Sequence, residues 1–328
     1  MALMSSKERV TAAIEFKGPD RTPIFLGAPW DKLQSPTVAG NPAMYPNDYY
    51  HCPVGWYYEG ELFGRNMDNW GCEWLNLQES GIGQVVGHPL GDINCLDSYI
   101  WPKAADNDMT LACEMSEKRG DKYFILGYIS LFERMIHIRG FENTLMDIAL
   151  EEDHFFTIRD KILQYDLDLI EMLLELNPDG IFIGDDWGSQ ISLLISPDSW
   201  RKYFLPAYKK MFDKIRNAGK HVFLHTDGYT MDILPDFVKA GANVFYIEFA
   251  VNGHKQVKEK LGGRVAFLNL PDTQITAFGT FDEIGNHIKE LIDNFGSYNG
   301  GFISSYKLDD SEKGKFILEK SKKYCNIY

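Results

Sequence analysis

Two short segments of this 328-residue chain combine side chains that can transfer protons or bind a metal ion. In the first segment, Asp185 and Asp186 follow the apolar run 180–184. Neighbouring residues of an extended chain point to opposite sides, so one carboxylate can face a pocket while the other caps a nearby turn. We assign the pocket position to Asp186, because a carboxyl group with apolar surroundings can act as a general acid near neutral pH.

The second segment places His225 and Asp227 at the end of the apolar run 221–224. Residues two apart in an extended chain point the same way, so the imidazole and the carboxylate can face one pocket. Glu248 follows the next apolar run, where an unpaired charge would cost free energy. Zinc accepts histidine nitrogen and carboxylate oxygen. The pattern predicts a zinc ion held by His225, Asp227 and Glu248, with His225 also available for proton transfer.

The same residues have purely structural interpretations, which the sequence leaves open. His225 could cap its strand while Asp227 starts the following helix. Arg264, near the next apolar run, could neutralise Glu248 as an ion pair. Only two of the predicted metal ligands stand close together in the sequence, so the third depends on how neighbouring strands are placed.

Aromatic and amide side chains near other apolar runs are candidates for substrate binding. We predict that role for Trp30, Tyr128, Trp187 and Asn269. Trp187 suits stacking on a substrate and suits packing in the core equally well. Tyr306 follows the run 302–305, and its phenol could polarise an ether or carboxyl oxygen, so we predict that it is catalytic.

The elements that carry these residues alternate between strands and helices. Short apolar runs are separated by stretches of helical periodicity, which is typical of parallel βαβ units. The expected strands end at Leu26, Tyr128, Gly184, His225, Glu248, Asn269 and Ser305. Polar residues cluster at these carboxyl ends, where a barrel carries its active site. We therefore predict an α/β protein with a (β/α)8 TIM barrel. A doubly wound open sheet is the alternative, and the absence of a GxGxxG segment weighs against it.

The whole chain, 1–328, is expected to form one catalytic domain. The stretch 27–102 is irregular and rich in Tyr, Trp, Pro and Gly. We interpret it as an N-terminal insertion that shapes the pocket mouth, with one or two short strands near 70–77. A helix capped by Ser5 or Ser6 and running to about Phe16 should precede the first strand.

The composition excludes several classes of partner. A formal net charge of −14 opposes binding to phosphate backbones and anionic membranes, and no Lys/Arg run offers a local exception. Five widely spaced cysteines without a CxxC pair fit a reducing cytoplasm. No apolar run approaches the roughly 18 residues of a membrane span. We expect a cytoplasmic protein with neither nucleic-acid nor membrane partners.

Several motifs resemble the uroporphyrinogen decarboxylase superfamily. They are Lys7-Glu8-Arg9-Val10, Pro19-Asp20-Arg21-Thr22-Pro23, Asp68-Asn69-Trp70-Gly71-Cys72, Tyr99-Ile100-Trp101-Pro102, Gly184-Asp185-Asp186-Trp187-Gly188, His225-Thr226-Asp227-Gly228 and Gly300-Gly301-Phe302-Ile303. The resemblance covers nearly the whole chain and implies the barrel fold. The superfamily includes decarboxylases of tetrapyrrole synthesis and methyltransferases that serve corrinoid proteins.

Two departures from the superfamily's motifs separate the chain from its best-known branches. True uroporphyrinogen decarboxylases carry an arginine-rich loop for their substrate's carboxylates, whereas the stretch 25–31 here has no arginine. The methyltransferase branch has a zinc motif of the form His-x-Cys-Gly with a later cysteine. In this chain Asp227 stands at the position of the motif's cysteine, so a carboxylate oxygen replaces the sulfur ligand. The only later cysteine is Cys325. The resemblance is therefore closer to members that demethylate methoxy or methylamine compounds.

The leading hypothesis is a corrinoid-dependent methyltransferase, the O-demethylase component of such a system. It would demethylate a small methylated substrate and pass the methyl group to cobalamin on a partner corrinoid protein. The aromatic-rich stretch 30–74 favours a methoxylated aromatic donor. No Asp-x-His-x-x-Gly stretch occurs in this chain, so the cobalamin must arrive on the partner. The alternatives are a cofactor-independent decarboxylase of a small carboxylic acid and a non-catalytic ligand-binding barrel.

Overall fold

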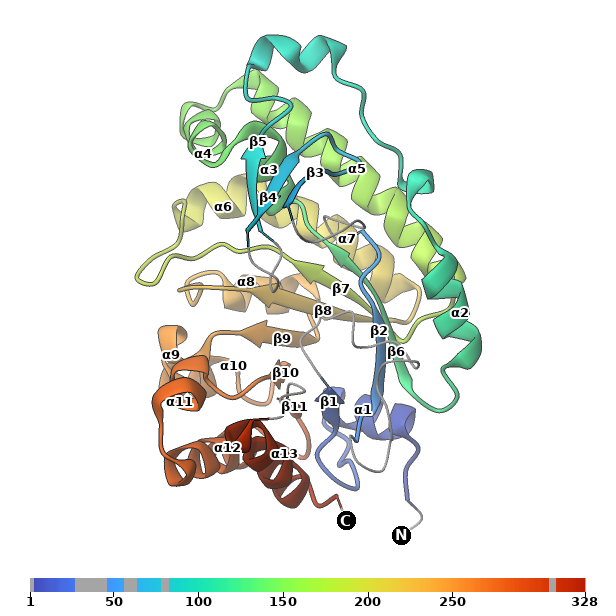
Figure 1. Ribbon diagram of the computed structural model, residues 1–328, viewed down its shortest axis with the longest axis vertical. Coiled ribbons are helices and arrows are strands. Elements are labelled where there is room, and N and C mark those ends of the chain that lie inside the picture. The colour runs from blue at the N-terminus through green and yellow to red at the C-terminus, as the bar shows by residue number, and fades with distance from the viewer. Residues whose placement is uncertain (1–2, 27–45, 56–63, 78–82, 307–310, 328) are drawn as a thin grey trace.

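A sheet of eight parallel strands forms the centre of the molecule in a computed structural model (Figure 1). The structure describes residues 3–26, 46–55, 64–77, 83–306 and 311–327. Going round the sheet, the strands are β1 (Ile24–Leu26), β11 (Phe302–Tyr306), β10 (Ala266–Asn269), β9 (Val244–Ile247), β8 (His221–Thr226), β7 (Gly180–Gly184), β6 (Tyr123–Ile129) and β2 (Tyr49–Cys52).

Hydrogen bonds between β1 and the residues just before β2 draw the two edges of the sheet together. The Asp48 backbone N–H donates to the Ile24 carbonyl oxygen at 2.9 Å. The Leu26 N–H donates to the Asn47 side-chain oxygen at 3.2 Å. The sheet thereby forms a nearly closed barrel, which confirms the predicted (β/α)8 architecture.

Helices surround the barrel and bury the outward faces of its strands (Figure 1). They are α1 (Ser6–Ile14), α2 (Thr110–Lys118), α3 (Phe132–Arg139), α4 (Phe141–Leu150), α5 (Asp153–Glu175), α6 (Pro197–Tyr203), α7 (Leu205–Asn217), α8 (Leu234–Ala240), α9 (Phe249–Asn252), α10 (His254–Leu261), α11 (Thr273–Phe278), α12 (Phe281–Phe295) and α13 (Glu312–Tyr324), with the 3-10 turns η2 (Ile93–Ser98) and η3 (Ala104–Asp106). Strands covered on both faces read as continuous apolar runs, which is why the sequence revealed them. Of the helices in the described ranges, none has the length and hydrophobicity needed to cross a bilayer.

Seven of the eight barrel strands end within one residue of the expected position. The remaining one, β2, lies inside the stretch 27–102, so this stretch contributes a barrel strand as well as surface structure. Its sequence, Tyr-Tyr-His-Cys, lacks the apolar run that identified the others. The same stretch contains a three-stranded antiparallel sheet of β3 (Gly64–Met67), β4 (Glu73–Asn76) and β5 (Gln84–Gly87), where we expected one or two strands.

The small sheet is attached to α3 through a buried ion pair. Arg134 of α3 lies 2.9 Å from Asp68, and both side chains are almost completely buried. Asp68 also accepts hydrogen bonds from the Trp70 and Cys72 backbone N–H groups and from the Trp74 indole. The motif around Asp68 therefore fastens this sheet to the barrel.

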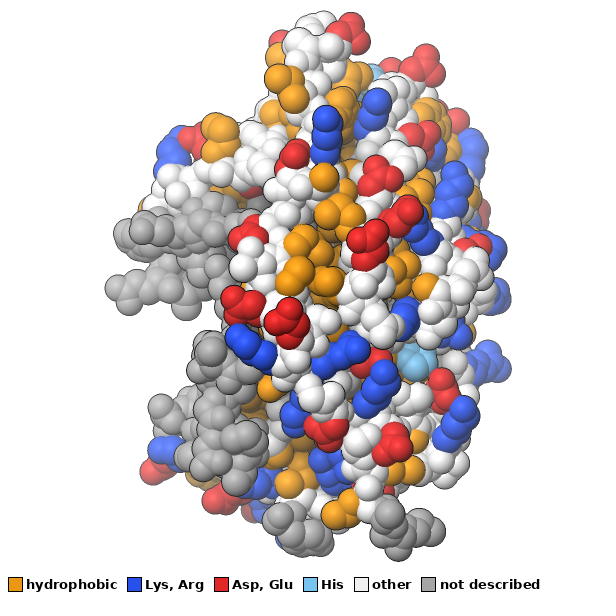
Figure 2. Space-filling view, turned by 90° about the vertical axis from the view of Figure 1, so that its right-hand side faces the viewer, with side chains coloured by type: hydrophobic (Ala, Val, Ile, Leu, Met, Phe, Trp, Pro, Cys, Tyr) orange, Lys and Arg blue, Asp and Glu red, His pale blue; other side chains and the backbone are white. Residues whose placement is uncertain are grey.

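Figure 2 shows one face of the molecule, on which acidic and basic side chains are interspersed and separated by hydrophobic side chains. The described side chains on this face form no continuous basic surface of the kind that binds nucleic acid.

The amino-terminal motif residues form a charge network at the end of the barrel where the strands begin. Asp48 accepts hydrogen bonds from the guanidinium groups of Arg9 and Arg21, each at 2.8 Å, and from the Ile24 N–H at 2.9 Å. Arg9 also pairs with Asp20 at 2.6 Å. Residues at this end of a barrel contribute to stability and not to catalysis. The network joins α1 to the first two strands.

We expect Asp48→Asn to lower the free energy of unfolding by about 2–3 kcal/mol, because it removes the charge that two partly buried arginines share. Denaturant titration measures the effect. Asp213→Asn is the matched control: Asp213 forms an exposed ion pair with Lys209 one helical turn away. Its loss should cost less than about 0.5 kcal/mol. Equal effects of the two substitutions would show that the network does not stabilise the barrel.

Candidate functional site

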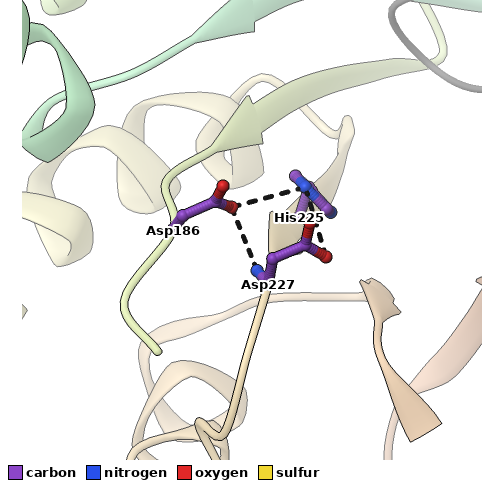
Figure 3. A group of neighbouring side chains, drawn as sticks. All are labelled: Asp186, His225 and Asp227. Carbon is purple, nitrogen blue, oxygen red and sulfur yellow. Dashed lines mark hydrogen bonds and ion pairs between the residues drawn. The ribbon is translucent and has the colours of Figure 1, made fainter. Parts of the chain in front are cut away.

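Three side chains that bear acid or metal-binding groups meet at the carboxyl ends of β7 and β8 (Figure 3). One ligand atom of each of Asp186, His225 and Asp227 lies within 4.8 Å of the others. His225 Nε2 is 3.5 Å from Asp186 Oδ1 and 3.8 Å from Asp227 Oδ1. The Asp227 backbone N–H donates to Asp186 Oδ1 at 3.0 Å and thereby holds the two loops together.

The orientation of His225 follows from a backbone contact. Its Nδ1 lies 3.1 Å from the carbonyl oxygen of Tyr246 on β9, and a carbonyl can only accept, so Nδ1 carries a proton and donates it. The ring is only 3% exposed. Nε2 therefore faces the two carboxylates. A histidine anchored through one ring nitrogen in this way is well suited to bind a metal ion through the other.

The electrostatics of the group favour a positive charge among the three residues. Burial raises the pKa of Asp227 above its ordinary value, and the nearby carboxylates of Asp186 and Glu248 raise it further. The His225 imidazole acts in the opposite direction. A bound cation, or a proton on Asp227, would relieve this repulsion.

Asp185 points away from the group and supports the start of α3. Its side chain is fully buried. It accepts hydrogen bonds from the hydroxyls of Ser130 and Tyr208, at 3.0 and 2.6 Å, and from the N–H groups of Leu131 and Glu133, at 3.0 and 2.8 Å. Burial raises its pKa to about 6, although these hydrogen bonds act in the opposite direction. The two adjacent carboxylates thus lie in different surroundings: Asp185 is buried at the start of α3, and Asp186 lies beside His225.

Trp187 packs in the core, contrary to the predicted substrate contact. The residue is fully buried, and its ring stacks on Phe132 with ring centroids 3.9 Å apart. Its indole N–H donates to the Tyr208 hydroxyl at 2.9 Å. The indole cannot reach a ligand, because Phe132 and the surrounding aromatic residues cover it. This was the structural alternative that the sequence left open.

Glu248 lies beside the three-residue group without belonging to it. Its Oε2 accepts a hydrogen bond from the Gly228 N–H at 3.0 Å. Asp186, instead of the predicted Glu248, joins His225 and Asp227 in the group whose atoms are close enough to share a metal ion. Arg264 is exposed and precedes β10, so it lies at the opposite end of the barrel from Glu248, which follows β9. Within the described ranges, no ion pair joins the two residues.

A pocket of about 170 Å³ opens next to Asp227. We call it the acidic pocket. Its walls come from β9, β10 and the segments that follow them, and its lining comprises Asp227, Tyr246, Ile247, Glu248, Phe249, Ala250, His254, Asn269, Leu270, Pro271, Asp272, Thr273 and His287. Asn269, which we predicted to bind substrate, is thus among the lining residues of this pocket.

Sequence reasoning missed His254, His287 and Asp272. The two histidine rings lie 5.8 Å apart, and His287 Nε2 accepts a hydrogen bond from the Asp272 N–H at 3.0 Å. Both histidines belong to helices outside the barrel strands, so the rule of polar residues at strand ends did not apply to them. No local motif in the sequence indicates that they share a pocket.

Tyr128 lies behind the three-residue group. Its ring centroid is 6.4 Å from that of His225 and 5.4 Å from that of Phe182. A β-carbon at Gly184 would come within 2.6 Å of the Tyr128 hydroxyl oxygen, so glycine leaves the space this phenol occupies. Burial raises the pKa of Tyr128 well above its ordinary value, so the phenol stays neutral. Tyr128 thus helps to shape the site from behind.

Tyr306 is separated from His225 by the width of two strands, β9 and β10. Its hydroxyl donates to the Pro46 carbonyl oxygen at 2.9 Å, and its ring packs with Ile24 and Leu26. It also lines a second pocket of about 430 Å³, bounded by α11 and the start of α13. The structure therefore does not bring Tyr306 together with Asp186 and His225 as predicted. Trp30, the remaining predicted contact, lies outside the described residues.

The fold and the site define a class of protein: a parallel (β/α)8 barrel with an acid–imidazole group at the carboxyl ends of its strands. The family model for uroporphyrinogen decarboxylase (URO-D) matches residues 123–306. The chain belongs to this family, as its motifs indicated.

A solved structure shares this fold over nearly its whole length. A methyltransferase from Methanosarcina mazei superimposes with a TM-score of 0.73 at 18% sequence identity, over 98% of this chain and 99% of that one. A dihydropteroate synthase from Xanthomonas albilineans is much more distant, with a TM-score of 0.36 at 12% identity over 51% of this chain and 62% of that one. A search of curated protein sequences finds no match.

Proposed function

We propose that this protein is a methyltransferase that demethylates a small substrate and passes the methyl group to cobalamin on a partner corrinoid protein. The observation that carries the proposal is the convergence of Asp186, His225 and Asp227 beside a small pocket at the carboxyl face of the barrel. Membership of the URO-D family and the whole-chain likeness in fold to a methyltransferase support it.

The residues of the site match the needs of demethylation. When a methyl group leaves oxygen or nitrogen, the heteroatom must be protonated or polarised. Because Nδ1 of His225 donates to Tyr246, Nε2 is the nitrogen through which this residue can accept or deliver a proton, and it faces the carboxylates. Asp186 and Asp227 lie 3.5 and 3.8 Å from Nε2, and burial raises the pKa of Asp227, which favours its protonated form.

The same three residues fit a zinc ion. They offer one imidazole nitrogen and two carboxylate oxygens, which is a donor set zinc accepts, and three protein ligands leave one position open. When bound, the metal would act as a Lewis acid toward the heteroatom that carries the methyl group. Asp186, His225 and Asp227 would hold the metal, and Tyr246 would fix the orientation of the imidazole.

A corrinoid protein would supply the methyl acceptor. The chain itself contains no Asp-x-His-x-x-Gly stretch, so the proposal places cob(I)alamin on a separate protein that approaches the barrel mouth. The sequence suggested two classes of methyl donor, methoxy compounds and methylamines. Both have a heteroatom on which the site could act.

The proposal is tested by mixing the purified protein with a corrinoid protein in the cob(I)alamin state and a panel of methoxy and N-methyl compounds. Methylation of the cobalt changes its visible absorbance, and we expect this change only when all three components are present. Release of carbon dioxide from a small carboxylic acid without the corrinoid protein would instead establish a decarboxylase. Binding of a ligand without methyl transfer or decarboxylation would indicate a non-catalytic ligand-binding barrel.

Metal removal is a separate test. We expect about one zinc ion per chain, loss of methyl transfer on chelation, and recovery when zinc is restored. If the metal-free protein kept its full activity, the metal would be rejected, and His225 and Asp186 would act in proton transfer alone.

A further inference from the structure

The acidic pocket has an excess of negative charge. Glu248 and Asp272 line it beside Asp227, and none of the described lining residues is a lysine or arginine. A zinc ion on the three-residue group would balance Asp186 and Asp227. It would leave Glu248 and Asp272 without a positive partner in the pocket.

One of the two pocket histidines, His287, does not supply the missing positive charge. Burial lowers the pKa of His287, and the neighbouring His254 lowers it further, so His287 is neutral at physiological pH. Its Nε2 already accepts a hydrogen bond from the Asp272 backbone. His287 therefore does not offset the carboxylates of the pocket.

The aromatic lining of the pocket also suits a cation. Tyr246 and Phe249 belong to this lining, and the ring of Phe249 stacks on Phe295 with centroids 4.4 Å apart. Aromatic faces attract alkylammonium groups, so Tyr246 is an aromatic lining residue that suits such a ligand. The carboxylates and this aromatic residue both favour a positively charged ligand.

The enclosed space of the pocket suits a compact group. A cavity of about 150 Å³ accommodates one benzene molecule. At about 170 Å³, the acidic pocket encloses about as much space, and because it is open a larger donor could extend beyond it. A branched alkylammonium group is compact enough for this space.

We infer that the acidic pocket recognises the positive charge of an alkylammonium group on the methyl donor. This inference rests on the proposed function, because it assigns the substrate class of the same site. Glu248 and Asp272 bind the ammonium group and thereby hold the donor beside Asp186, His225 and Asp227.

Binding of choline to the purified protein tests the inference, with the neutral analogue in which carbon replaces the nitrogen as the matched probe. The two molecules have the same shape, so only the charge differs. Isothermal titration calorimetry should show choline binding at least about tenfold more tightly, in zinc-loaded and in chelated protein alike. Equal affinities for the two probes would overturn the inference.

Two substitutions locate the charge that is recognised. Glu248→Gln keeps an oxygen that can accept the Gly228 hydrogen bond and removes the negative charge. We expect it to weaken choline binding about tenfold and to leave binding of the neutral analogue unchanged. Glu259→Gln, on the exposed face of α10, makes the same change in net charge away from the pocket and should have no effect. Asp272→Asn removes the other negative charge of the pocket and so tests the same expectation independently.

The outcomes separate this inference from the proposed function. Methyl transfer from neutral donors without selective binding of choline would reject the ammonium pocket and retain the methyltransferase. Selective binding of choline without methyl transfer from any ammonium compound to the corrinoid protein would retain the pocket and reject the methyltransferase. Loss of selectivity in Glu259→Gln as well would show that the net charge of the protein, and not the pocket, attracts the cation.

Discussion

His225→Ala is expected to lower the rate of methyl transfer by about 100- to 10,000-fold and to abolish stoichiometric zinc binding. The range is that of general acid–base catalysis, and the substitution removes Nε2, the atom that would either move a proton or ligate the proposed metal. Zinc content, measured on the purified variant, gives a readout that does not depend on the identity of the substrate.

His221→Ala provides the control on the same strand. His221 is a buried histidine at the amino end of β8, where Nδ1 contacts the Tyr123 hydroxyl at 2.6 Å. Its removal should lower stability and leave the zinc content and the activity of the folded protein unchanged, because it lies at the opposite end of the barrel from the site. If the two variants behaved alike, the effect of His225 would be structural and the site assignment would be wrong.

Asp185→Ala is expected to lower the free energy of unfolding by about 3–5 kcal/mol, because four hydrogen-bond donors in the core lose their acceptor. Urea titration measures the loss. Asp186→Ala, one residue along the chain, is the control. The Asp186 side chain is 42% exposed, so this variant should lose activity while its stability changes by less than about 1 kcal/mol.

The effect of Asp185→Ala should also depend on pH. The pKa of Asp185 is raised to about 6 in the folded protein, so between its ordinary value and about 6 the folded state binds a proton that the unfolded state has lost. Protonated Asp185 contributes fully to the free energy of unfolding below the ordinary pKa of aspartate. This contribution is lost as pH rises through about 6. The difference between wild type and variant should therefore shrink by up to about 3 kcal/mol from about pH 4 to about pH 7. A difference that grew with pH would contradict a raised pKa.

The sequence by itself determined the barrel, and it indicated most of the residues that the structure brings together at the candidate site. Strands buried on both faces must be continuously apolar, so each polar residue that follows one is conspicuous, and parallel strands bring their carboxyl ends to one face. That reasoning identified Asp186, His225, Asp227 and Asn269. Strand alternation also indicated that Asp185 and Asp186 would point in different directions.

Only the tertiary structure decided which carboxylate completes the group at His225. Both β7 and β9 neighbour β8, so Asp186 and Glu248 were equally available from strand order alone. Hydrogen bonds decide between them: the Asp227 N–H binds Asp186 beside the imidazole, whereas the Gly228 N–H binds Glu248 at the adjoining pocket. Such contacts depend on loop conformations that no residue pattern specifies.

The tertiary structure also decided which residues are covered and which residues distant in sequence meet. Trp187 looks like a pocket residue in the sequence, yet Phe132, far away in the chain, stacks on it and excludes any ligand. His254 and His287 come from two different helices and meet in the acidic pocket. Periodicity reports only which face of its own element a residue occupies, whereas these contacts depend on how separate elements pack against one another.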